Sequence, residues 1–79
     1  MEESIGKNIR EARLEHNLSQ SELCYRIRMK GKLGLYQNNL SNIERGIFRP
    51  SLETLRAIAQ ELDLTVDDLL QYGRKKHGR

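Results

Sequence analysis

Helix-start signals recur along this chain and constrain its fold more than any other feature of the sequence. Ser19 and Glu22 have the spacing of a capping box, in which each side chain bonds the backbone N–H of the other residue. Thr65 and Asp68 repeat this spacing, and leucines flank both boxes at the positions of a hydrophobic staple. Each box therefore predicts the first turn of a helix.

The pattern as a whole predicts five short helices, because helical periodicity recurs and strand-like alternation of apolar and polar residues is absent. The predicted helices run from after Ser4 to about His16, from Ser19 to Met29 or Lys30 and from Gln37 to Arg45, with a fourth capped by Ser51 and a fifth capped by Thr65. A chain of 79 residues has room for one domain. We expect an all-α fold, a compact five-helix domain over residues 1–72, followed by a basic, disordered tail over residues 73–79.

One charged residue interrupts the apolar stripe of the first predicted helix. Ile5, Ile9 and Ala12 share one face of that helix, and Arg13 falls on the same stripe. Because an unpaired buried charge is very costly, this arginine requires an anionic partner from elsewhere in the chain.

The composition argues against several classes of protein. The mean hydropathy is −0.74, and no uncharged apolar run approaches the roughly 20 residues of a transmembrane helix. The N-terminus lacks the basic start and apolar stretch of a signal peptide. The single cysteine, Cys24, is expected to pack in the core, and with two histidines it makes a poor zinc set. We expect a cytoplasmic protein that is not an enzyme, contacts no membrane and holds no metal or cofactor.

Positive charge gathers in the middle of the chain, although the net charge is only +3. Residues 26–49 carry six Lys and Arg side chains against one acid, whereas residues 1–25 and 50–72 are net acidic. A basic centre between acidic flanks is typical of a surface that faces phosphates, but a solvated helix face has the same composition. Charge alone leaves both interpretations open.

The third predicted helix separates apolar residues from amides. At 100° per residue, Leu40 and Ile43 fall on one side of this helix. The opposite side is polar and free of acids, and it carries Asn38, Ser41, Asn42 and Arg45. Amides pair with adenine edges in the major groove, and Asn is a mediocre helix former, which argues against a purely structural choice. This face is therefore suited to reading base edges.

Four segments, in this order, resemble the Cro/phage-repressor (XRE-like) helix-turn-helix family. They are residues 5–10 (IGKNIR), 18–23 (LSQSEL), 40–46 (LSNIERG) and 50–55 (PSLETL), and the resemblance extends over about residues 5–70. Ile-Glu-Arg-Gly followed by Pro-Ser-Leu-Glu makes the combination highly specific. The resemblance implies a five-helix DNA-binding domain that acts as a dimer on a palindromic or pseudo-palindromic operator.

The resemblance also implies roles for individual residues. It places base reading on the third helix, at Gln37, Asn38 and Asn42, with Asn39 and Ser41 as lesser candidates. It places contacts to DNA phosphates at Gln20, Arg45 and Arg49. The family often pairs an arginine of its first helix with the glutamate of the Glu-Arg-Gly turn, positions that Arg13 and Glu44 hold here. We interpret this pair as structural.

The chain departs from the family pattern between the second and third helices. This connection is about six residues longer than in the commonest members, and Tyr36 replaces the small capping residue expected before the third helix. The extension adds Arg28, Lys30 and Lys32, which we expect to contact phosphates without reading bases.

We therefore predict a sequence-specific DNA-binding transcriptional regulator, a repressor that binds double-stranded DNA as a homodimer and occludes the promoter. An antitoxin that binds a toxin and its own promoter is the alternative within the DNA-binding class. A helical adaptor for protein interactions is the rival outside that class. A toxin or an antirepressor would be the protein partner, and Leu70 and Tyr72 are candidates for the dimer surface. Because the domain fills the chain, we expect no attached ligand-sensing domain.

Overall fold

The computed structural model describes residues 2–31 and 33–72 and has five α-helices in this part of the chain. They are α1 (Glu2–Glu15), α2 (Gln20–Met29), α3 (Gln37–Glu44), α4 (Leu52–Glu61) and α5 (Val66–Leu70), with no strand among the described residues. The predicted all-α, five-helix fold is confirmed. Helix α1 begins at Glu2, three residues before the predicted start after Ser4, and α3 ends one residue earlier than predicted because Arg45 is its C-cap. The predicted tail lies outside the described residues.

The helix starts are capped where the sequence predicted. The Glu22 N–H donates to Ser19 Oγ at 3.0 Å, and the Ser19 N–H donates to Glu22 Oε1 at 2.8 Å, a bond that lowers the pKa of the glutamate. Thr65 and Asp68 make the same reciprocal pair of bonds at 2.9 and 3.1 Å. Ser51 caps α4 by accepting a backbone N–H at 3.1 Å. These bonds satisfy backbone donors that a helix N-terminus leaves without an internal partner.

Four helix ends turn through residues with positive φ. Gly31 and Gly46 end α2 and α3 with φ values of 70° and 81°, as expected for C′ glycines. Asn17 and Asp63 adopt φ values of 57° and 61° after α1 and α4. Short polar side chains tolerate this left-handed region better than other non-glycine residues. The chain can therefore turn away sharply at the end of each of these four helices.

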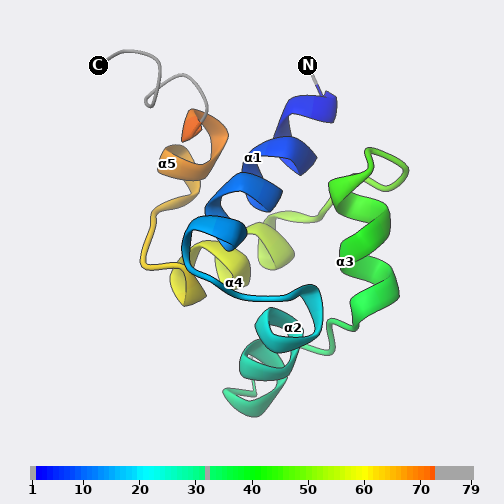
Figure 1. The fold of residues 1–79 in the computed structure, drawn as a ribbon, viewed down its shortest axis with the longest axis vertical. Helices are drawn as coiled ribbons and strands as arrows, with labels where there is room; N and C mark the ends of the chain where they lie inside the picture. The colour runs from blue at the N-terminus through cyan, green and yellow to red at the C-terminus, as the bar shows by residue number, and fades with distance from the viewer. Residues whose placement is uncertain (1, 32, 73–79) are drawn as a thin grey trace.

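The helices surround one small apolar core. Helix α1 contacts α3 and α5, α2 contacts α3 and α4, and α4 contacts α5. Figure 1 shows α3 on the right-hand edge of the molecule and α5 on the opposite side of α1. The largest fully buried side chains are Ile9, Leu23, Cys24, Ile27, Leu40, Ile58, Leu62 and Leu69. Burial raises the pKa of the Cys24 thiol to about 11, so this cysteine is the packed, unreactive residue that was predicted.

A buried ion pair joins α1 to the end of α3. Arg13 Nε and Nη2 donate to the two carboxylate oxygens of Glu44 at 2.8 and 2.9 Å, and Arg13 Nη1 donates to the Leu18 carbonyl at 2.8 Å. Arg13 is 6% exposed and Glu44 is 9% exposed. A bidentate pair with this third bond compensates for removing both charges from water. The partner that the sequence required for Arg13 is therefore Glu44.

Helices α1 and α3 also approach very closely at Gly6. A Cβ atom at this position would lie 2.3 Å from the Ile43 carbonyl oxygen and 2.8 Å from that of Glu44. Both neighbours are backbone atoms, so no side chain could rotate away to make room. The absence of a side chain at residue 6 thus lets α1 pack directly on the end of α3.

Helix α1 holds α5 through polar contacts. The buried Asn8 side chain donates to the carbonyl oxygens of Leu69 and Leu70 at 3.0 and 3.1 Å. The Tyr72 hydroxyl donates to the Glu15 carboxylate, and burial together with this bond raises the pKa of Tyr72 to about 12. Leu70, one of the two candidates for a dimer surface, is 47% exposed, whereas Tyr72 packs partly against the core.

Replacing Arg13 by Met should leave the Glu44 carboxylate buried without its cation. We expect Arg13→Met to lower the free energy of unfolding by about 3–5 kcal/mol, because breaking a buried pair leaves an uncompensated charge. Denaturant unfolding followed by circular dichroism measures this loss. The double variant Arg13→Met/Glu44→Met should recover much of it, and a single variant as stable as the wild type would exclude a structural role for the pair.

Adding one methyl group at residue 6 should push α1 away from α3. We expect Gly6→Ala to destabilise the fold by about 1–3 kcal/mol through overpacking, although alanine is the better helix former. Lys7→Ala, on the exposed side of the same helix, is the control and should change stability by less than about 0.5 kcal/mol. Thermal unfolding compares the two variants, and a stabilised Gly6→Ala protein would disprove the close contact.

Candidate nucleic-acid interface

Helix α3 presents a polar face to solvent. Its apolar side chains, Leu40 and Ile43, are buried as predicted. The remaining positions of the helix before Glu44 are exposed or half-buried, and they are the five residues predicted to read bases: Gln37, Asn38, Asn39, Ser41 and Asn42. The structure thus brings the whole predicted set together on one exposed helix. Amide and hydroxyl groups on such a helix can both donate to and accept from base edges in a major groove.

Hydrogen bonds from α2 orient the first side chain of α3. The Gln37 side-chain amide donates to Gln20 Oε1 at 3.4 Å, and Ser21 Oγ donates to Gln37 Oε1 at 2.9 Å. Gln20 in turn donates to Glu44 Oε1 at 3.0 Å. A continuous chain of polar contacts therefore leads from the buried Arg13–Glu44 pair to the start of α3. Sequence reasoning missed Ser21, whose only signal is its place in the first turn of α2, next to Gln20.

Asn39 has a second role that sequence reasoning also missed. Its Oδ1 atom accepts the Tyr36 backbone N–H at 3.3 Å, which is the backward half of a capping box. Tyr36 itself provides no side-chain cap for α3. Asn39 also lines a shallow groove beside the α3–α4 connection, together with Phe48 and Pro50. The polar residue at the third helical position was the available signal for this cap.

The longer connection between α2 and α3 is held by the core and by α2. Leu35 is buried and Leu33 packs against the core, so both leucines anchor the connection. Arg28 Nη1 donates to the Leu35 carbonyl at 2.8 Å, and the guanidinium carbon lies 4.3 Å from the centroid of the Tyr36 ring. The residues that lead into α3 are thus held from α2.

The cations predicted to contact phosphates lie at different places on the surface. Arg45 and Arg49 are exposed in the loop that follows α3, where the Ile47 and Phe48 N–H groups donate to the Asn42 carbonyl and hold this loop against the helix. Lys30 Nζ lies 2.9 Å from Glu61 of α4, with most of its side chain exposed. Lys32 lies outside the described residues.

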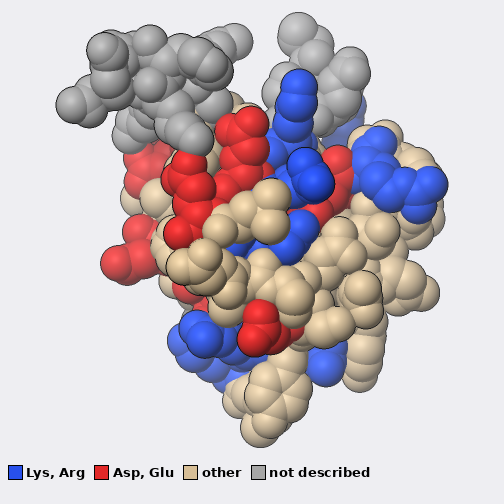
Figure 2. Space-filling view, viewed as in Figure 1, with Lys and Arg blue, Asp and Glu red and all other residues tan. Residues whose placement is uncertain are grey.

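Charge is distributed unevenly over the surface. Figure 2 shows blue side chains over the loop that follows α3, while the area over α3 itself is mostly tan. Red side chains gather on the other side of this view, over α1 and α5. An anionic partner would therefore be attracted to the α3 side and repelled from the α5 side.

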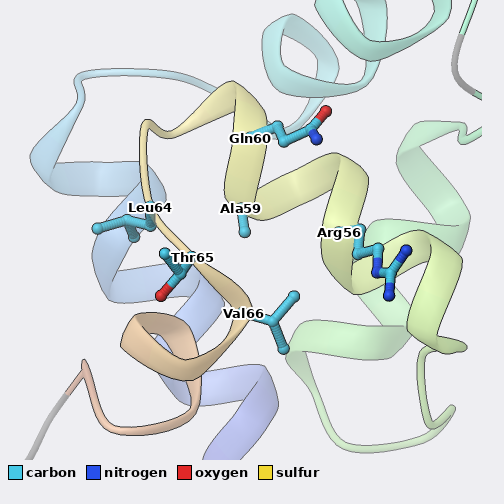
Figure 3. A pocket seen from close by; sticks show the side chains of 6 residues that line it. All are labelled: Arg56, Ala59, Gln60, Leu64, Thr65 and Val66. Carbon is cyan, nitrogen blue, oxygen red and sulfur yellow. The ribbon is translucent and has the colours of Figure 1, made fainter.

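A second concave feature lies between α4 and α5. Figure 3 shows the side chains of this shallow groove, which are Arg56, Ala59, Gln60, Leu64, Thr65 and Val66. Its single titratable group is Arg56, so the lining contains no acid–base pair. Among the residues described, no cluster of three His, Cys, Asp or Glu side chains could hold a metal ion. No helix in this part of the chain has the length and apolar character needed to cross a membrane.

Comparison with known proteins agrees with this geometry. A helix-turn-helix family profile matches residues 9–69. The chain is 39% identical over 64 residues to an uncharacterized HTH-type transcriptional regulator of Sinorhizobium fredii. The aligned segment covers 81% of this chain but only 30% of the relative's length. No solved structure matches the chain significantly. With most of its described helices inside the matched segment, the chain belongs to the Cro/phage-repressor (XRE-like) helix-turn-helix family, a family of DNA-binding transcription regulators.

Proposed function

We propose that this chain is a sequence-specific repressor that acts in the cytoplasm and binds a palindromic or pseudo-palindromic operator as a homodimer. The polar face of α3, oriented by Gln20 and Ser21, is the observation that supports this function most directly. Two copies of α3 would enter successive major grooves, about 34 Å apart, and the bound dimer would block RNA polymerase. The action is binding and occlusion, with no chemical step.

Base reading falls to the side chains on the start and exposed face of α3. Gln37, Asn38 and Asn42 would each offer a donor and an acceptor to adenine, with Asn39 and Ser41 in lesser roles. Gln37 is the best prepared of these, because two hydrogen bonds already orient its amide. A side chain that is ordered before binding loses less conformational entropy when the complex forms.

Phosphate contacts would fix the position of the domain on the duplex. Arg45 and Arg49 are suited to this role because they are exposed in the loop next to α3. Gln20, at the start of α2, has a second amide hydrogen besides the one it donates to Glu44. Lys30 and Lys32 belong to the same proposed set, and Lys30 would exchange its partner Glu61 for a phosphate.

Selection of DNA from a random pool tests the whole proposal. We expect enrichment of an inverted repeat whose half-sites are separated by about 10 base pairs, one helical turn, because a two-fold symmetric dimer reads a symmetric site. Sequencing of the bound fraction gives specificity, symmetry and spacing together. If nothing is enriched even at low salt, the proposed function is wrong.

Single variants should separate base reading from phosphate contact. On the selected operator, we expect Asn38→Ala and Asn42→Ala each to cost about 1–3 kcal/mol of binding free energy, with little effect on unrelated DNA. Arg45→Ala should weaken binding to every sequence and reduce the slope of log K against log salt by about 0.9. Titrations by fluorescence anisotropy at several salt concentrations measure both quantities.

Variants on α4 and α5 serve as matched controls for this comparison. Gln71→Ala removes an exposed amide next to α5, and Arg56→Ala removes an exposed arginine from α4. Both should leave affinity and salt slope unchanged. An equal loss on operator and unrelated DNA with Asn38→Ala would contradict base reading by that residue. Unchanged affinity and slope with Lys30→Ala and Lys32→Ala would remove these lysines from the phosphate set.

A further inference from the structure

The direction of α3 depends on a connection from α2 that is longer than in the commonest helix-turn-helix domains. Residues 30, 31 and 33–36, between α2 and α3, have no regular secondary structure, and Tyr36 at the N-cap offers no side-chain bond to the first turn. A connection of this length can leave α2 at many angles, because each added residue brings additional backbone freedom. Something other than the chain path must hold the start of α3 in place.

Arg28 makes contacts that can hold the start of α3 in place. Its Nη1 atom donates to the Leu35 carbonyl at 2.8 Å, and its guanidinium lies over the Tyr36 ring at 4.3 Å from the centroid. Leu35 and Tyr36 are the last two residues before α3. A guanidinium is planar and has five donors, so it can stack on a ring and bond a carbonyl at the same time.

The two sides of the first turn of α3 are therefore held by different parts of α2. Ser21 and Gln20, at the start of α2, hold the Gln37 side chain. Arg28, two turns further along, holds the backbone and ring that precede Gln37. The half-buried Arg28 guanidinium already serves the carbonyl and the ring, a geometry unlike that of a cation presented to phosphate.

We propose that Arg28 is a positioning residue for DNA specificity, acting through Tyr36 on the direction in which α3 presents Gln37 and Asn38. This inference rests on the proposed function and replaces the expectation that Arg28 contacts phosphate. Tyr36 supplies the ring on which the guanidinium rests. The pair substitutes for the missing side-chain cap and ties Leu35 and Tyr36 to α2.

The test compares specificity with salt dependence in one set of variants. The specificity ratio is the affinity for the selected operator divided by the affinity for an operator altered at the base that Gln37 contacts. We expect Arg28→Ala to reduce this ratio by about tenfold, the size of one good base contact. The salt slope should stay the same, because no phosphate contact is lost. Arg28→Lys should lose specificity as well, since an ammonium group cannot stack and bond the carbonyl together. Tyr36→Phe should retain specificity and Tyr36→Ala should lose it.

Arg26→Ala is the matched control. Arg26 is an exposed arginine of the same helix that faces Glu61 of α4, so this variant removes an equal charge without touching the connection. It should keep the specificity ratio of the wild type. A slope reduced by about 0.9 with intact specificity in Arg28→Ala would show a phosphate contact and overturn the proposal. Unchanged slope and unchanged specificity would overturn it too.

A measurement without DNA separates this inference from the proposed function. Hydrogen exchange of the backbone N–H groups in the first turns of α3 should accelerate in Arg28→Ala, while exchange in α4 stays the same. Unaltered exchange in α3 would show that Arg28 does not hold the helix, whatever the protein binds. Failure of the wild type to enrich any DNA would contradict the proposed function and leave this anchoring result standing. Circular dichroism checks that each variant is folded. If Arg28→Ala does not fold, the same measurements on Arg28→Lys and Tyr36→Ala test the proposal.

Discussion

The buried contact between Arg13 and Glu44 is the interaction on which the rest of the structure depends. It joins α1 to the end of α3, and its third bond, to the Leu18 carbonyl, fixes the turn before α2. The Glu44 carboxylate also accepts from Gln20, which holds Gln37. A buried charge is costly without its full set of partners, so any other arrangement of Arg13 and Glu44 in the core would be unfavourable. The stability of the domain and the orientation of its candidate reading helix thus share one pair of residues.

Close packing at Gly6 and the contacts of α2 complete the placement of α3. The missing Cβ at Gly6 lets α1 touch the backbone of Ile43 and Glu44, which positions the C-terminal end of α3. Ser21 and Arg28 act on its N-terminal end. A helix held at both ends can present side chains in a fixed direction, which reduces the entropy lost when it binds a partner. The uneven charge of the surface then favours an anionic partner on this side of the molecule.

Local signals were reliable wherever the cause of the structure lies within a few residues. Ser19 with Glu22 and Thr65 with Asp68 cap their helices as predicted, because a capping box needs only one turn of chain. The buried side of α3 also followed from periodicity. The positive φ of Asn17 and Asp63 was not predicted, since many polar residues occupy such turns without adopting it. The contact between Lys30 and Glu61 was missed because it depends on how α2 lies against α4.

The sequence by itself determined the helices, the caps of α2, α4 and α5, the buried side of α3, the need of Arg13 for a partner and the family that the chain resembles. These features follow from short-range spacing and from the high cost of burying an unpaired charge. Only the tertiary structure decided that Gln20, Ser21 and Gln37 form one network and that Arg28 rests on Tyr36. Those contacts span a connection whose path no local rule specifies. They exist because packing against the core brings the two ends of α2 to the start of α3.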